Sequence, residues 1–311
     1  MDISTIVNSV VSLFLIMLVG VYATRRNIIT DEINRGLTDI LLNIALPFLI
    51  ISSFILTYDD SVKNNVVKTF YLSIITFVLI GIVSYILLFP IKGDRKIILQ
   101  FSNVFTNTGY VGFPILNAIY GSEGILYGSI FQMFYVMFIW TYGIMLFKER
   151  VRGEGVYKDF KKTVVEVIMN PSIIAVLIGI MIMAFNIKIP DMFLTSIRSI
   201  ANITGPLSMI IVGGILSKVN IRNYAKDITV YYGIILKLFL IPGIIYFVLK
   251  IINDVSIITN SLVILAAMPA AIMTSIFAEG YNKEKEYATV IVFFTTIISI
   301  ITIPLMLKLL L

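Results

Sequence analysis

Ten apolar runs of roughly 20 residues each constrain the fold of this chain more than any other feature of its sequence. A helix needs about 20 apolar residues to cross a bilayer, whereas the strands of a membrane barrel alternate apolar and polar residues in segments of about 10. Only 14% of the residues are charged, against about 25% in a soluble domain. We therefore expect an all-α polytopic membrane protein with ten transmembrane helices. The runs cover residues 3–23, 37–57, 67–89, 97–119, 125–147, 164–186, 194–216, 229–250, 257–279 and 288–308.

The basic residues indicate how the chain lies in the membrane. Most of its 24 Lys and Arg residues fall in one set of loops, at 25–35, 92–96, 148–162, 218–226 and 283–285. Cytoplasmic loops carry such an excess. We therefore expect a multi-pass protein of the cell (plasma) membrane, surrounded by the lipid bilayer, with a cytoplasmic linker at 148–163 and both termini extracellular. The net charge of +6 belongs to this loop bias, so nucleic acid is not an expected partner.

The linker separates two halves that each hold five runs, residues 1–147 and 164–311. An odd number of spans in each half forces the second half to insert upside down, which is the inverted-repeat plan of many secondary transporters. Prolines support this plan, because each half carries two of them at a similar separation. They are Pro47 and Pro114 in the first half, and Pro206 and Pro269 in the second. The plan predicts that helices four and nine are broken and cross each other.

The fourth run contains a stretch that a regular helix in lipid would avoid. Its unusual residues are Asn107, Thr108, Gly109, Gly112 and Pro114. Backbone groups freed at membrane depth must bond to protein or to water in a cavity, and the start of a helix after a break carries partial positive charge. We therefore predict a carboxylate site here, with Asn107 and Thr108 as side-chain donors. The alternative is that these polar groups bond neighbouring helices and the glycines permit close packing.

We expect the ninth run to be broken at Pro269, next to Met268. Met268 and Tyr110 would form either an apolar wall of the site or ordinary packing between helices. Asn103, one turn before the polar stretch, suits packing and substrate contact equally. Trp140 and Tyr142 are expected to form an aromatic anchor at the membrane interface.

Three charged residues near or inside the runs are candidates for coupling or counter-charge. Lys237, in the eighth run, either extends its ammonium to the interface or faces a negative group. Glu279 and Asp39 either lie at the interface or take part in proton coupling. The chain contains neither Cys nor His, which excludes disulfides and thiolate metal sites and leaves little for acid–base catalysis. No metal, no cofactor and no enzyme activity are expected.

Four blocks of the sequence, in order, resemble the auxin efflux carrier family, which includes plant auxin exporters and bacterial permeases for malate and related acids. The blocks are FTNTGYVGFPILNAIYGSEGILY, NPSIIAVLIGI, KLFLIPG and MPAAIMTSIFAEGYNKEKEYATVIVFFTTIISIITIPL. The resemblance implies a fold similar to those of bile-acid symporters and sodium/proton antiporters. Helices one, two, six and seven would form a scaffold that dimerises with a second copy, and helices three to five and eight to ten a transport domain that moves like an elevator.

The resemblance also implies roles for particular residues. Asn107 matches the crossover asparagine that approaches the substrate carboxylate, and Pro114 and Pro269 match the crossover prolines. Pro47, Asn170 and Ser172 would lie on the scaffold side of the site, and Ser172 stands where plant members often carry another Asn. The chain is thus expected to be a secondary transporter of a small organic anion, malate-like or auxin-like. An uncoupled channel-like uniporter and a membrane sensor without transport are the alternatives, and the acid carried, the direction and the coupling ion stay open.

Overall fold

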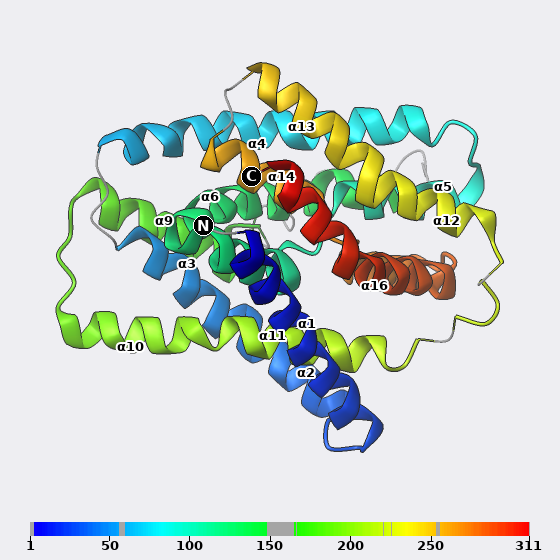
Figure 1. Ribbon diagram of the computed structural model, residues 1–311, viewed down its shortest axis with the longest axis horizontal. Helices are drawn as coiled ribbons and strands as arrows, with labels where there is room; N and C mark the ends of the chain where they lie inside the picture. Colours follow the sequence, from blue (N-terminus) through cyan, green and yellow to red (C-terminus); the bar gives the residue numbers. More distant parts are fainter. Residues whose placement is uncertain are drawn as a thin grey trace.

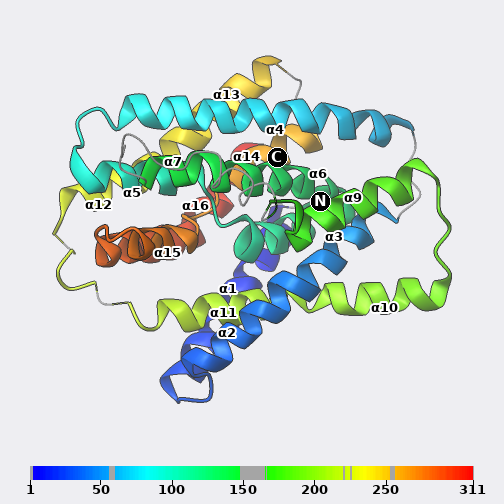
Figure 2. The ribbon, with the colours of Figure 1, turned by 180° about the vertical axis from the view of Figure 1, so that it is seen from behind.

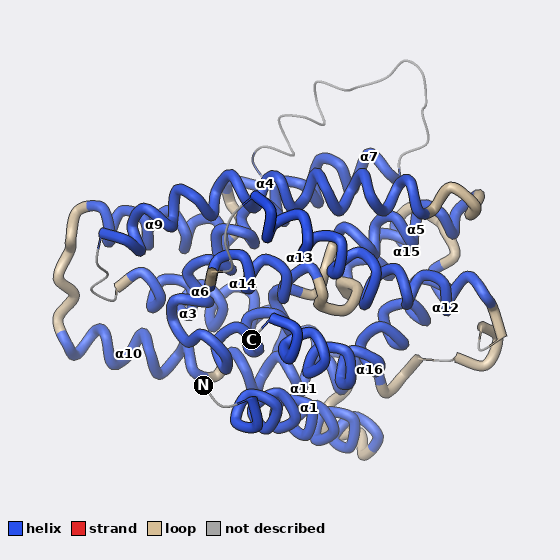
Figure 3. The backbone as a smooth tube through the Cα atoms, turned by 45° about the horizontal axis from the view of Figure 1, so that its top comes forward, coloured by secondary structure: helices blue, strands red, loops and turns tan. Residues whose placement is uncertain are grey.

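A computed structural model describes residues 3–55, 60–147, 165, 167–219, 221–224, 226–252 and 256–310, so the linker predicted at 148–163 lies outside the described residues. Every regular element of the described residues is a helix (Figure 3), which confirms the all-α prediction. Six helical segments among them are long and apolar enough to cross a membrane: Asp31–Phe54, Asn64–Leu87, Thr108–Phe147, Asp191–Leu216, Ile228–Ile252 and Lys285–Lys308. These segments confirm a polytopic membrane protein, and the inverted repeat of ten spans stays a prediction.

The elements follow the predicted apolar runs along the chain. Those of the first half are α1 (Ile3–Arg25), α2 (Asp31–Ile40), η1 (Leu41–Ala45), α3 (Leu46–Phe54), α4 (Asp60–Leu87), α5 (Gly93–Val104), η2 (Thr108–Gly112), α6 (Phe113–Phe138), η3 (Ile139–Gly143) and α7 (Ile144–Phe147). Gly121, at φ +57°, bends α6 between the fourth and fifth runs. A positive φ is cheap only for glycine, so this residue makes the turn between two spans.

The second half contains α9 (Pro171–Ala184), α10 (Asp191–Asn202), α11 (Thr204–Leu216), α12 (Ile228–Ile235), η4 (Leu236–Leu240), α13 (Ile241–Ile252), α14 (Ile257–Ala266), α15 (Met273–Gly280) and α16 (Lys285–Leu310). In two opposite views, α4 and the α10–α11 segment lie at opposite edges of the molecule, with α5, α6 and α14 between them (Figures 1 and 2). The middle of the molecule therefore contains α6 and α14, which pack against each other.

Two groups of helices pack within themselves. In one group, α1 contacts α11, and α3 contacts both α9 and α10; in the other, α6 contacts α4 and α14, and α15 contacts α16. The first group is held tightly, because a Cβ on Gly213 would lie 2.0 Å from the Met17 carbonyl oxygen, and a Cβ on Gly20 would lie 2.2 Å from that of Ile210. Glycines let two membrane helices bring their backbones together in this way. The two groups meet along α6, η2 and α16.

Three prolines follow directly after a wide π-helical turn. Pro47, Pro114 and Pro242 each stand two residues beyond the end of such a turn, namely η1, η2 and η4. A proline ring inside an α-helix clashes with the carbonyl four residues earlier, and that carbonyl here belongs to the π-turn, where the backbone is wider. The π-turn thus accommodates each proline, and the helix continues beyond it. Pro114 accordingly begins α6, and the break in the fourth span lies earlier, at residues 105–107.

Candidate functional site

The two interrupted helices cross and bond to each other through their broken segments. The Asn107 amide donates to the Pro269 carbonyl at 2.8 Å, and the Ala271 amide donates to the Phe105 carbonyl at 3.0 Å. Together they form a short antiparallel bridge. Backbone groups released in the apolar interior need protein partners, and here each break supplies partners for the other. The two predicted breaks are therefore brought together in one place.

Gly112 and Met268 form the packed contact between the crossing helices. A Cβ on Gly112 would lie 2.7 Å from Leu265 Cδ2 and 3.5 Å from Met268 Cγ. Met268 is fully buried. Neither residue lines the cavity described next, and the same is true of Pro269 and Pro47. These four predicted site residues therefore shape the crossing and its surroundings.

A cavity of about 280 Å³ lies beside the crossing. Its polar lining residues are Asn43, Thr106, Asn107, Thr108, Gln132, Asn170 and Ser172, and its aromatic ones are Tyr110, Tyr135 and Trp140. Gly109 and a set of aliphatic residues from η1, α3, α6, η3 and α15 complete the wall. Six predicted site residues therefore share this cavity: Asn107, Thr108, Gly109, Tyr110, Asn170 and Ser172. Among the residues that the structure describes, no Asp, Glu, Lys or Arg lines it.

Asn107 is the most exceptional residue of the cavity. Its side chain is buried, with 3% of the residue exposed, and Nδ2 has no hydrogen-bond partner in the part of the chain that the structure describes. Within the same residues, Thr106 Oγ1 beside it is also buried and unpartnered. A buried polar group without a partner costs about 1–3 kcal/mol. A ligand with acceptor atoms would therefore recover free energy by bonding to Asn107.

The neighbouring polar groups are engaged with the protein. Thr108 Oγ1 donates to Gln132 Oε1 on α6. Asn170 caps α9 by accepting a hydrogen bond from the Ser172 amide at 3.0 Å. These contacts hold the cavity walls in place and leave Asn107 and Thr106 as its unpaired polar groups on the crossing segment.

Two helix starts face the same cavity. The helix that resumes after the first break begins at Thr108, and α15 begins at Met273 after the second; both residues line the cavity. The start of a helix carries partial positive charge, and each start favours a nearby anion by about 0.3–1 kcal/mol, or up to about 2 kcal/mol when partly buried. An uncharged cavity at two such helix starts is suited to a small anion.

Lys237 lies behind the crossing and outside the cavity lining. Its side chain is buried at 1% exposure, and Nζ donates to the Asn103 carbonyl at 3.0 Å. Asn103 belongs to the last turn of α5, where helix carbonyls carry partial negative charge. The side-chain amine of Lys237 therefore faces a helix end in the interior of the protein. The Asn103 side chain donates to Ser84 Oγ at 2.9 Å and so packs α5 against α4.

Two predicted carboxylates do not line the cavity. Glu279 forms an exposed ion pair with Lys285 at 2.5 Å. Asp39 is exposed on α2, and its backbone carbonyl accepts a hydrogen bond at 2.9 Å from the side chain of Asn43, a residue of the cavity wall. Asp39 therefore lies close to the cavity without lining it.

Sequence reasoning overlooked Gln132 and Tyr135 as cavity residues and assigned Trp140 elsewhere. Trp140 was predicted to anchor the protein at the membrane interface, but it lines the cavity, with its ring centroid 6.2 Å from that of Phe277. Tyr142 accepts a hydrogen bond from Gln100 at 2.8 Å. The available signal was Gln132 itself, a lone amide inside the apolar fifth run.

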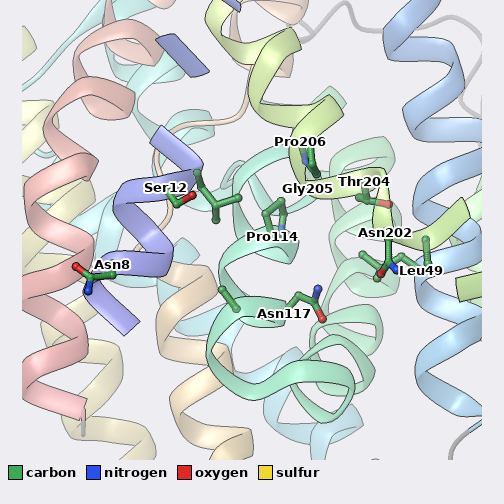
Figure 4. A pocket seen from close by; sticks show the side chains of 12 residues that line it. Asn8, Ser12, Leu49, Pro114, Asn117, Asn202, Thr204, Gly205 and Pro206 are labelled. Atoms are coloured by element: carbon green, nitrogen blue, oxygen red, sulfur yellow. The ribbon is translucent and has the colours of Figure 1, made fainter. Parts of the chain in front are cut away.

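A second cavity, of about 540 Å³, lies beside the first turns of α6 (Figure 4). Pro114 lines this cavity and does not line the first. Pro206, the predicted counterpart of Pro47, lines the second cavity as well. The two prolines therefore share one site although they stand on different helices.

Comparisons with known proteins place this chain among membrane transport proteins. The family described as "Membrane transport protein" matches residues 5–307. An uncharacterized transporter of Methanocaldococcus jannaschii is 26% identical over 313 residues, covering 95% of this chain and 96% of that protein. An uncharacterized transporter of Methanothermobacter thermautotrophicus is 22% identical over 299 residues, covering 96% of each protein.

Proposed function

The chain belongs to the membrane transport protein family, that of the auxin efflux carriers, and from this premise we propose that it is a secondary transporter of a small organic anion. It is a membrane transporter; the anion and the mechanism are the proposal. The observation that supports this proposal most is the unpaired side-chain amide of Asn107, which lies in an uncharged cavity at two helix starts. A carboxylate would accept from Asn107 Nδ2 and lie at the positive ends of both helices, with its organic part against the aromatic and aliphatic wall.

The strength of such binding follows from these contacts. A hydrogen bond to a charged group contributes about 1.5–3 kcal/mol, and each helix start contributes about 0.3–2 kcal/mol. Every 1.4 kcal/mol changes an affinity about tenfold. The amide of Asn107 alone should therefore account for a factor of about 10 to 100 in affinity.

The walls of the cavity support an elevator mechanism. Leu46 and Asn170 come from the helix group that we assign to the scaffold, whereas Asn107 and Met273 come from the group that we assign to the transport domain. A substrate at this boundary would be carried when one group slides against the other. Asn170, a residue of the cavity wall, starts α9 soon after the linker predicted to be cytoplasmic, which favours access to the cavity from the cytoplasm. In this orientation both termini lie outside the cell. Dimerisation through the scaffold is part of the same proposal.

Transport by purified protein in liposomes tests the proposal, with labelled L-malate and indole-3-acetate as probes. We expect Asn107→Asp, which keeps the shape of the side chain but adds a negative charge, to reduce flux at least tenfold. Asn64→Asp, the same change at an exposed position on α4, should leave flux unchanged. Absence of flux and binding for every mono- and dicarboxylate tried, together with wild-type behaviour of Asn107→Asp, would refute the proposal.

The same preparation separates the alternatives. Flux that responds to neither pH nor sodium gradients would indicate an uncoupled uniporter. Tight binding of a probe without flux would indicate a sensor that has kept the fold.

A further inference from the structure

The second cavity is built from both helix groups and continues into a neighbouring hollow. Its polar lining residues are Asn8, Ser12, Asn117, Asn202 and Thr204. A hollow of about 160 Å³ shares Leu49, Asn117, Ala201 and Asn202 with it and adds Ser52, Ser53, Ser122, Ile125 and Arg198. We call the two together the outer recess. Figure 4 shows Asn117 on α6 and Asn202 beside α11 reaching into the space between these helices.

Thr204 lines this recess and carries a buried hydroxyl. The residue is 1% exposed, and its Oγ1 has no hydrogen-bond partner among the described residues. A helical threonine can bond the carbonyl one turn earlier, as Thr195 does to Asp191 on α10 at 2.9 Å. A buried hydroxyl without a partner is costly. Thr204 is therefore a group that a ligand in the recess would satisfy, as Asn107 is at the crossing.

The charge of the recess indicates the class of ligand. Arg198 lies one helical turn before Asn202 and is exposed at the mouth of the recess. All its other lining side chains are uncharged. A guanidinium binds carboxylates through paired hydrogen bonds, and the amides and hydroxyls deeper in the recess supply further donors. The lining therefore favours an organic carboxylate over a cation.

We propose that the outer recess is a second carboxylate-binding site, distinct from the cavity at the crossing, and that Arg198 draws the anion into it. The inference rests on the proposed function, because it assigns to the recess the same class of substrate. The recess lies on the side predicted to be extracellular, and Pro114 and Asn117 connect it to the helix that leaves the crossing. The recess is thus placed to bind the anion before it enters the site at the crossing or after it leaves that site.

Binding stoichiometry of the full chain in detergent is the first test, with L-malate and indole-3-acetate as probes. We expect wild-type protein to bind two molecules of a probe per chain, and Thr204→Val to bind one. Thr195→Val, the same change on α10 where the hydroxyl bonds its own helix, should still bind two. A single bound molecule that is lost with Asn107→Asp and unaffected by Thr204→Val would overturn the second site alone. No binding at all would overturn the proposed function with it.

Thiol protection gives a second readout that does not depend on counting sites. The chain contains no cysteine, so a single Asn202→Cys substitution can be labelled specifically by a membrane-impermeant thiol reagent. We expect either probe to slow labelling at this position several-fold. Ser196→Cys, exposed elsewhere on α10, should be labelled at the same rate with and without probe.

Combining the substitutions distinguishes the two sites. In the Asn202→Cys/Asn107→Asp double variant, protection should persist, because the recess binds independently of the crossing. Loss of protection in this variant would show that the signal comes from the crossing site and would overturn the proposal. Adding Arg198→Gln should raise the probe concentration needed for protection several-fold, and Lys188→Gln, the control for loss of an exposed positive charge, should not.

Discussion

Replacing Gly112 by alanine tests whether the crossing of the two broken helices depends on their close approach. The new Cβ would lie 2.7 Å from Leu265 Cδ2, a fully buried side chain. Overpacking of this kind costs about 1–3 kcal/mol. Gly109→Ala is the matched control, because it stands in the same π-turn and its Cβ would meet only Leu46 Cδ2, at an ordinary 3.8 Å.

Comparing the two variants separates the effect of the steric clash on stability from the helix preference of alanine. Both substitutions gain up to about 1 kcal/mol from replacing glycine in a helical segment, so this gain cancels between them. We expect Gly112→Ala to be less stable than Gly109→Ala by about 1–3 kcal/mol. The corresponding difference in melting temperature is about 2–4 °C for each kcal/mol in a chain of 150–250 residues, and a little less for a longer one.

Thermal unfolding followed by the fluorescence of Trp140, the single tryptophan of the chain, measures this difference. Trp140 lines the cavity at the crossing, so it reports on the region that is perturbed. Leu265→Val removes the clashing methyl group and should restore most of the stability of Gly112→Ala, with a coupling energy of about 0.5–3 kcal/mol. Equal melting temperatures for Gly112→Ala and Gly109→Ala would refute the reasoning.

Three other substitutions test the remaining contacts. Gly213→Ala would place a Cβ 2.0 Å from the Met17 backbone oxygen, so we expect a larger fall in melting temperature than for any other alanine variant here. Gly36→Ala, whose Cβ meets nothing within 4 Å, should raise the melting temperature slightly. Lys237→Met should reduce flux at least tenfold by removing the hydrogen-bond donor at the Asn103 carbonyl. Its effect on melting temperature should be smaller, because methionine is of similar length and avoids the cost of burying a polar amine; unchanged flux would contradict this.

The sequence was sufficient to predict the first break, because asparagine, glycine and proline in an apolar run are incompatible with a regular helix surrounded by lipid. The second break was predicted from Pro269, which stands in the corresponding position of the other half. The sequence also identified Asn107 and Thr108, which share the cavity. It placed the break too close to Pro114, because the π-turn that accommodates this proline depends on a backbone geometry that residue types do not specify. Thus the residues that disturb a helix can be identified from the sequence, but the position of the break can be identified only from the structure.

Other properties depend on contacts between distant parts of the chain. Lys237 bonds a carbonyl 134 positions away, so sequence alone could not distinguish a buried ammonium from one that reaches the interface. Trp140 presented a similar problem, because an indole suits an interface and a cavity wall equally. Gly112 and Met268 were assigned to the site since they lie next to it in sequence, and only the crossing geometry shows that they pack against each other.

The crossing also separates the helix ends by charge, which suits a protein that must release what it binds. Two positive helix starts face the cavity, and the buried amine of Lys237 faces the negative end of α5. An ammonium in the cavity itself, 4 Å from a carboxylate, would attract it by about 4 kcal/mol at an effective dielectric constant of 20, whereas a helix start contributes about 0.3–2 kcal/mol. Sites that pass ions onward bind them well enough to enter but weakly enough to leave. Anion preference supplied by helix ends and amides, with the lysine kept behind the crossing, meets both requirements.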